Sequence, residues 1–160
     1  MDDPRYTKKN YTPLQAKLKA ENYCAYQERA QQELRDKLYE WGMHSDDAEN
    51  IIAELITENF LNEERFAIAY ASGKFRMKGW GKVKIRQHLK LKKIPEKLIK
   101  NAINTINPEE YEDKINHLID LKTNGEKKPY NLKLKSKIYN YLSAKGYESD
   151  IILEKIHKDS

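Results

Sequence analysis

Residues 74–93 form a strongly basic run, KFRMKGWGKVKIRQHLKLKK, in which nine of twenty residues are Lys or Arg and none is Asp or Glu. Residues 24–73 have the opposite balance, with eleven acidic and four basic side chains. Ammonium and guanidinium groups at this density attract phosphate groups or an acidic protein surface. The formal net charge of the whole chain is only +5. The positive charge is therefore concentrated in one run, which favours a polyanionic or acidic partner over a merely solvated surface.

The candidate contacts with DNA or with a protein partner are the basic side chains of this run: Lys74, Arg76, Lys78, Lys82, Lys84, Arg86, Lys90, Lys92 and Lys93. A tryptophan flanked by glycines, Trp80, interrupts the run. Its indole is either a plug in the core between helices or an exposed ring that stacks on a base or a partner, and the plug is the favoured interpretation.

Residue types that carry catalytic chemistry are present, but their spacing does not form a site. The histidines are scattered, at His44, His88, His117 and His157, and none lies four residues from another His or from a Cys. The chain has no CxxC pair, no glycine-rich phosphate loop and no nucleophile elbow. Adjacent carboxylates at 46–47, 63–64 and 109–110 fall where helices are expected to begin, and acids there interact favourably with the helix dipole. The sequence predicts a protein that is not an enzyme and holds neither a metal nor a cofactor.

The composition also predicts the compartment. The single cysteine, Cys24, cannot form an internal disulfide and is expected to be a buried apolar side chain, in agreement with a reducing environment. No apolar run approaches the ~18 residues needed to span a bilayer, and the N-terminal residues lack the apolar core of a signal peptide. We expect a cytoplasmic protein with no membrane contact.

The elements that position these residues are all expected to be helices. The predicted ranges are 13–26, 29–41, 45–58, 62–77, 81–92, 95–105, 108–122, 131–144 and 148–157. Thr12, Asn62 and Asn107 are predicted N-caps, because their side-chain oxygens can accept from the free N–H groups of a first turn. Glycines at 42, 125 and 146 are expected where helices end.

One apolar spacing occurs three times, at periods of 51 and 53 residues. In each copy the first apolar residue is followed by others four, nine and eighteen positions later: Leu34, Leu38, Met43, Ile52; Ile85, Leu89, Ile94, Ile103; and Ile138, Leu142, Tyr147, Ile156. Ser45 and Ser149 are matching predicted N-caps in the outer copies. Such repeats stack by sharing hydrophobic faces.

The repeat predicts an all-α protein of three tandem three-helix units, stacked into an elongated, curved molecule. The predicted organisation is a flexible N-terminal segment 1–11, a first repeat 12–60, a basic second repeat 61–106 and a third repeat 107–160. The protein is expected to be a monomer.

The sequence resembles the RecX family of regulators of the RecA recombinase over residues 14–156. The resemblance lies in the order of three motifs rather than in any one of them. The matching residues are Arg29, Glu33, Leu34, Arg35, Lys37 and Leu38; then Glu63, Arg65, Phe66, Ala67 and Tyr70; then Lys78, Gly79, Lys82, Lys84 and Leu89. Asn62 stands where the family pattern has an acid, and the third repeat keeps little of the motif.

The resemblance implies a non-enzymatic protein of three helical units that binds RecA filaments on single-stranded DNA. It further implies inhibition of ATP hydrolysis, strand exchange and the co-protease activity that triggers the SOS response. Arg35 and Arg65 lie in matched motifs and are candidate recombinase contacts. The alternative for Arg35 is an internal pair with Glu28 or Glu33, and for Arg65 a pair with acids next to Glu64.

Single-stranded DNA is expected to bind weakly and without sequence preference. Two other functions remain open on the sequence. One is a free-standing DNA- or RNA-binding protein built from helix-turn-helix-like units, although only the middle unit is strongly basic. The other is a helical adapter with no nucleic-acid role.

Overall fold

The structure, a computed structural model, describes residues 10–157. The predicted N-terminal segment 1–11 lies outside the described residues except for Asn10 and Tyr11. Within 10–157 the chain forms nine α-helices and no strand, which confirms the predicted all-α class. The helices are α1 (Pro13–Tyr26), α2 (Gln31–Glu40), α3 (Ser45–Thr57), α4 (Glu63–Lys78), α5 (Lys82–Leu91), α6 (Glu96–Asn104), α7 (Pro108–Thr123), α8 (Leu132–Lys145) and α9 (Ser149–His157).

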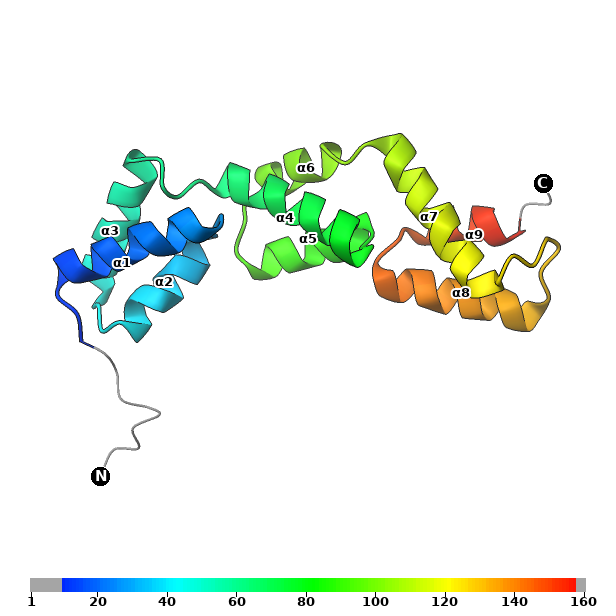
Figure 1. The fold of residues 1–160 in the computed structure, drawn as a ribbon, viewed down its shortest axis with the longest axis horizontal. Helices are drawn as coiled ribbons and strands as arrows, with labels where there is room; N and C mark the ends of the chain where they lie inside the picture. Colours follow the sequence, from blue (N-terminus) through cyan, green and yellow to red (C-terminus); the bar gives the residue numbers. More distant parts are fainter. Residues whose placement is uncertain (1–9, 158–160) are drawn as a thin grey trace, which may run out of the picture.

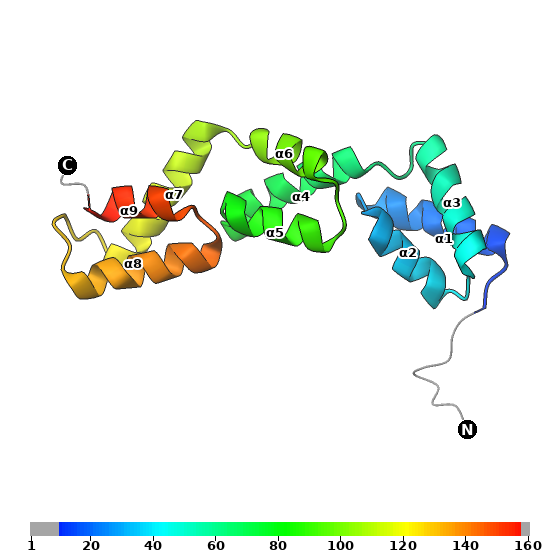
Figure 2. The same cartoon turned by 180° about the vertical axis from the view of Figure 1, so that it is seen from behind.

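The helices form three groups of three along one long axis, as Figure 1 shows. We call α1–α3 the first unit, α4–α6 the middle unit and α7–α9 the last unit. Figure 2 shows the same three units from behind, with α1–α3 at one end of the molecule and α7–α9 at the other. The expected elongated stack of three-helix units is confirmed.

Polar side chains cap the helices where the sequence predicted them. The hydroxyl of Thr12 accepts from the Gln15 N–H at 3.2 Å, and the Asn62 side chain accepts from the Arg65 N–H at 2.9 Å. Asn107 accepts from two N–H groups of the first turn of α7. The prediction for Ser45 and Ser149 is wrong, because the chain is already helical at both residues and they begin α3 and α9.

The apolar repeat defines the core, since all twelve repeat positions are buried. Each copy also closes its helix with the same backbone bond, from Met43 to Leu38, from Ile94 to Leu89 and from Tyr147 to Leu142, at 2.9–3.2 Å. The residue before that bond has a left-handed backbone in all three copies: Gly42 (φ 92°), Lys93 (φ 63°) and Gly146 (φ 95°). A side chain in this conformation costs roughly 1–2 kcal/mol, which explains the two glycines and makes Lys93 the exception.

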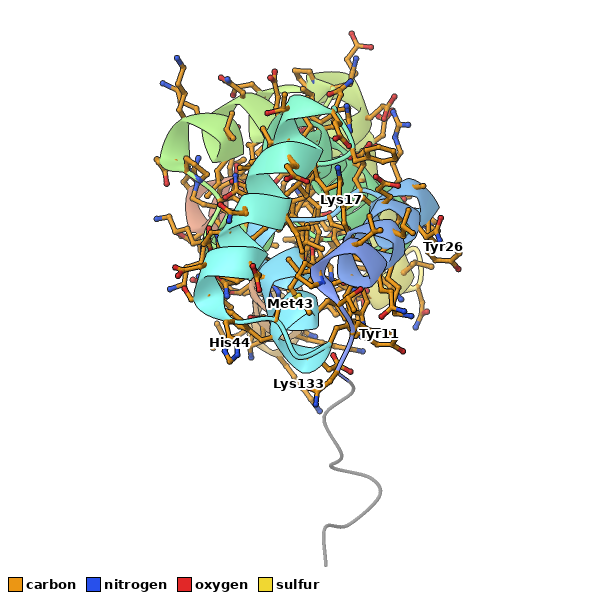
Figure 3. All side chains as sticks on the ribbon, turned by 90° about the vertical axis from the view of Figure 1, so that its left-hand side faces the viewer. Tyr11, Lys17, Tyr26, Met43, His44 and Lys133 are labelled. Carbon is orange, nitrogen blue, oxygen red and sulfur yellow. The ribbon has the colours of Figure 1, made fainter. Side chains whose placement is uncertain are left out.

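The first unit has a core of its own, whereas the middle and last units share one core. Lys17 on α1 forms ion pairs with Glu54 and Glu58, at 3.0 and 2.9 Å, and so links α1 to the C-terminal end of α3. Figure 3 looks along the long axis at this unit, with Met43 between the helices and Tyr26 at its rim. The exposures agree, at 5% for Met43 and 83% for Tyr26.

The two junctions between units are chemically different. Between the middle and last units the contacts are backbone bonds and close packing, with the Gly81 N–H donating to Lys145 O at 2.8 Å and the Val83 N–H to Gly146 O at 2.9 Å. The hydroxyl of buried Tyr147 donates to Gly79 O at 2.8 Å. Backbone bonds of this kind hold the two units in one fixed relation.

Between the first and middle units most contacts are polar. The Gln31 N–H donates to a Glu63 oxygen at 3.1 Å, and the Lys92 ammonium lies 3.5 Å from Glu33. Ala30, the residue just before α2, is buried in the core that the middle and last units share. The junction therefore depends mostly on charged and hydrogen-bonded side chains.

No helix within residues 10–157 is long and apolar enough to cross a membrane.

Gly81→Ala is expected to lower the free energy of unfolding by about 1–3 kcal/mol, because overpacking a tight contact forces atoms apart. A Cβ at Gly81 would lie 2.4 Å from Gly146 O and 2.6 Å from the Tyr147 N atom. Urea denaturation measures the change. The matched control is Gly73→Ala in α4, where the new Cβ meets nothing within 4 Å. That change should raise stability by about 0.5–1 kcal/mol, and equal stability of the two variants would contradict the tight junction.

Candidate nucleic-acid interface

The basic side chains of α5 lie on two opposite sides of the helix. Positions 84, 88 and 92 are four residues apart and share one side, whereas 82, 86 and 90 share the other, since each residue advances about 100° around the axis. Ile85 and Leu89 are fully buried and separate the two sides. The basic run therefore does not form one continuous patch, and each side has its own surroundings.

The first side faces three aromatic rings. The Trp80 and His88 rings lie 4.6 Å apart between centroids, tilted by 52°, and the Tyr70 ring meets Trp80 edge-on at 6.4 Å. Trp80 and Tyr70 are half-buried and pack against the shared core. Trp80 therefore packs as the plug interpretation expects and keeps part of its ring accessible.

Three lysines surround these rings. The Lys84 and Lys74 ammonium groups lie 4.6 and 5.0 Å from the Trp80 ring centroid, and Lys92 lies 5.7 Å from that of Tyr70. We call the lysine–aromatic face the set Tyr70, Lys74, Trp80, Lys84, His88 and Lys92. Aromatic rings bordered by cations are the arrangement on which single-stranded nucleic acid stacks its bases while its phosphates contact the cations.

The electrostatics of this face are strongly positive. Burial, followed by the charges of Lys84, Lys74 and Lys92, lowers the pKa of His88 below its usual value. Among residues 10–157, Lys74 and Lys84 form no ion pair with a carboxylate. Their charges are therefore available to an external anion, and only Lys92 is partly neutralised, by Glu33.

The other predicted contact residues have internal partners or stand apart. Arg86 is paired with Glu96, and Lys90 lies 3.8 Å from the same carboxylate. Arg76 pairs with Glu110 at 3.4 Å, and the Lys82 ammonium lies over the Tyr111 ring at 4.7 Å. Lys78 and Lys93 are exposed. Of the nine predicted contacts, the structure thus brings together Lys74, Lys84 and Lys92.

Arg35 and Arg65 each form an ion pair within the chain, with partners that the sequence did not predict. Arg35 on α2 forms two bonds to Glu49 on α3, one of them at 3.2 Å. Arg65 on α4 bonds Glu28 at 3.0 Å and both the side chain and the carbonyl oxygen of Asn59. The predicted partners, Glu28 or Glu33 for Arg35 and the acids next to Glu64 for Arg65, are wrong, because packing between helices decides both pairs.

Sequence reasoning missed two members of the lysine–aromatic face, Tyr70 and His88. His88 had a usable signal, since it lies four residues from both Lys84 and Lys92 and so shares their side of a helix. Tyr70 had the same signal toward Lys74, four residues later on α4, whose ammonium lies 5.4 Å from its ring centroid, but its approach to Trp80 comes from the packing of α4 on the loop after it.

Two known protein-family patterns match this sequence, and their limits agree with the first and middle units. A family described as "RecX, first three-helix domain" matches residues 16–55, and one described as "RecX, second three-helix domain" matches residues 62–103. The chain belongs to the RecX family. The lysine–aromatic face lies within the matched second RecX domain.

Relatives among curated sequences are regulatory proteins. The regulatory protein RecX of Clostridium perfringens (strain 13 / Type A) is 33% identical over 124 residues, covering 76% of this chain and 58% of that protein. That of Bacillus cytotoxicus is 26% identical over 137 residues, covering 86% and 51%. The chain thus spans about half the length of the curated relatives it matches. RecX is a family of regulators rather than of enzymes.

Solved structures share the fold. A crystal structure of RecX from Lactobacillus salivarius superposes with a TM-score of 0.78 at 24% identity, covering 91% of this chain and 96% of that one. A crystal structure of a regulatory protein RecX gives 0.78 at 23% identity, covering 92% and 73%.

Proposed function

We propose that this RecX chain binds the RecA recombinase filament on single-stranded DNA and inhibits its ATPase, strand-exchange and co-protease activities. It would thereby modulate DNA repair and the SOS response in the cytoplasm, acting as a monomer without a cofactor. The observation that carries the proposal is the lysine–aromatic face, whose rings, together with the Lys74 and Lys84 ammonium groups that form no ion pair within residues 10–157, suit a single strand. Membership of a family of regulators supports a role in control rather than in catalysis.

The distribution of charge supports a partner with surfaces of both signs. Residues 13–57 carry nine acids and five bases, whereas residues 62–103 carry twelve bases and three acids. A filament of protein wound on DNA offers phosphates to the basic unit and protein surfaces to the flanking units. Charge complementarity of this kind mainly steers association and excludes wrong partners.

The test compares binding to three targets: naked single-stranded DNA, recombinase alone, and recombinase polymerised on single-stranded DNA. The proposal expects the tightest binding to the filament, with weak binding to naked DNA that disappears as salt rises. Equal affinity for naked DNA and for the filament would instead support a free-standing nucleic-acid-binding protein. Binding to none of the three would leave only the adapter alternative.

The role of the first unit is tested by Arg35→Ala. Arg35 is our candidate recombinase contact there, and its pair with Glu49 lies at the surface, with the two side chains 22% and 48% exposed. Exposed pairs contribute about 0–1 kcal/mol, so the melting temperature should change little. A loss of inhibition at an unchanged melting temperature indicates a partner contact. Glu49→Gln is the matched control, since it breaks the same pair and leaves the guanidinium in place.

Arg65→Ala is expected to behave differently. Arg65 bonds Glu28, whose other carboxylate oxygen is buried without a hydrogen-bond partner. Removing the guanidinium should lower stability by about 1–2 kcal/mol, because a partly buried charge loses its partner. Chemical denaturation measures this loss. If the variant keeps its stability but no longer inhibits the recombinase, Arg65 contacts the recombinase and the internal pair does not stabilise the fold.

A further inference from the structure

A polar pocket lies where the middle unit meets the last unit. Its volume is about 410 Å³, and it is lined by parts of α5, the end of α8 and the start of α9. The side chains that matter for binding are Lys84, Gln87, His88, Ser143 and Ser149. They supply an ammonium, an amide, an imidazole and two hydroxyl groups, all of which can donate hydrogen bonds to an anion.

The pocket depends on the tight junction around it. The carbonyl oxygen of Gly146 accepts from the Val83 N–H at 2.9 Å, and a Cβ at Gly146 would lie 2.2 Å from the Cβ of Lys84. Because Gly146 has no side chain, α5 can pack directly against the turn between α8 and α9. The pocket therefore exists only when the two units are packed together, and neither could form it alone.

Negative charge is absent from the lining of this pocket. No Asp or Glu contributes to its walls among the described residues. Of the two carboxylates near the start of α9, Glu148 accepts a hydrogen bond from the Tyr111 hydroxyl, and Asp150 is exposed outside the lining. Besides its contact with the Trp80 ring, the Lys84 ammonium donates one long hydrogen bond, 3.5 Å, to the Ala144 carbonyl oxygen. An entering anion would meet donors and no competing acid.

We propose that this junction pocket binds a phosphate group of a nucleic-acid strand, and that His88 takes up a proton when the phosphate enters. The inference rests on the proposed function and identifies where on the chain a strand is held. Lys84 and His88 belong both to the pocket and to the lysine–aromatic face. One strand can therefore place a phosphate in the pocket and a base against the neighbouring rings.

The proton uptake follows from the groups that surround His88. Lys84 and Lys92 face it from α5 and Lys74 faces it from α4, and together with burial they lower its pKa. From the last unit comes Tyr147, whose pKa burial raises, so its hydroxyl stays neutral and bonded to Gly79. A phosphate offsets the three positive charges and stabilises the imidazolium. By linkage, binding must then tighten as the pH falls.

The experiment follows the C2–H resonances of the four histidines by NMR during pH titration, with and without oligothymidylate of twelve nucleotides. We expect the His88 midpoint to rise by about one pH unit on binding, as for one charge a few ångströms away. His44, which is exposed in the first unit, is the control, and oligothymidylate should leave its resonance unchanged at each pH. A rise of this size makes binding about fivefold to tenfold tighter at a pH below the His88 midpoint of the free protein than at pH 8.

Variants separate the pocket from the rest of the basic surface. His88→Gln should remove the pH dependence, whereas His44→Gln should keep it. Ser149→Ala should weaken binding about threefold to tenfold, as expected for the loss of one solvent-accessible hydrogen bond. Ser136→Ala on the far part of α8 is the control for loss of an exposed hydroxyl.

The possible outcomes decide different questions. If the chain binds oligothymidylate but the His88 midpoint is unchanged, or His88→Gln keeps the pH dependence, the pocket assignment is wrong while the proposed function stands. If the chain does not bind oligothymidylate even at low salt, both the pocket assignment and the DNA part of the proposed function fail. If inorganic pyrophosphate at equal ionic strength moves His88 as far as the oligonucleotide does, the ligand is a free polyphosphate and not a strand.

Discussion

ATP hydrolysis by a recombinase already polymerised on single-stranded DNA is expected to fall when this chain is added at well below one molecule per recombinase subunit. The reason is the shape of the chain, since three units in a row can contact several filament subunits at once. In a cooperative polymer, holding one subunit interface affects the neighbouring subunits. A steady-state ATPase assay at increasing ratios of chain to recombinase measures the effect, with strand exchange as a second readout.

The control for this result separates specific inhibition from competition for DNA. Lys74→Gln/Lys84→Gln/Lys92→Gln should weaken inhibition strongly if the lysine–aromatic face contacts the strand inside the filament. Recombinase preassembled on a saturating length of DNA leaves little naked strand for the chain to sequester. If the unaltered chain leaves ATPase and strand exchange unchanged even in molar excess, the regulatory proposal should be abandoned in favour of a free-standing nucleic-acid-binding protein.

The salt dependence of binding to single-stranded DNA is expected to depend on one side of α5 and not on the other. If about four phosphates are neutralised, log K should fall with log salt at a slope near −3. Replacing Lys74, Lys84 and Lys92 by Gln should make that slope shallower by about 2, at about 0.7 for each lost contact. Fluorescence anisotropy of a labelled oligothymidylate measures the slope.

The matched control replaces Lys82, Arg86 and Lys90 by Gln, which removes the same three charges. Glu96 already holds Arg86 and lies near Lys90, and Lys82 lies over the Tyr111 ring. This variant should change the slope by less than about 1. Substitutions at positions 82, 84 and 86 together would remove charge from both sides of α5, and the salt slope could then not show which side contacts the strand. Equal slopes for the two triple variants would show that the charge of the run matters and its arrangement does not.

The sequence by itself determined the helices, several of their caps and the repeat. Caps such as Thr12 and Asn62 accept from N–H groups three residues away, and Gly146 ends its helix through its own backbone. Such interactions depend only on residues a few positions apart, so a short stretch of sequence is enough to predict them. The apolar spacing predicted the buried side of α2, α5 and α8 for the same reason, because the helical period alone places residues four apart on one side.

Only the tertiary structure decided how the charges are grouped. Lys74 joins Lys84 and Lys92 because α4 and the Trp80 loop pack beside α5, a relation that no local spacing encodes. Arg65 pairs with Glu28, thirty-seven positions earlier, rather than with an acid of its own helix. The junction pocket likewise requires Gly146 to meet Lys84 across two units. Such contacts depend on the angles and distances at which helices pack, which are set by side chains far apart in the sequence.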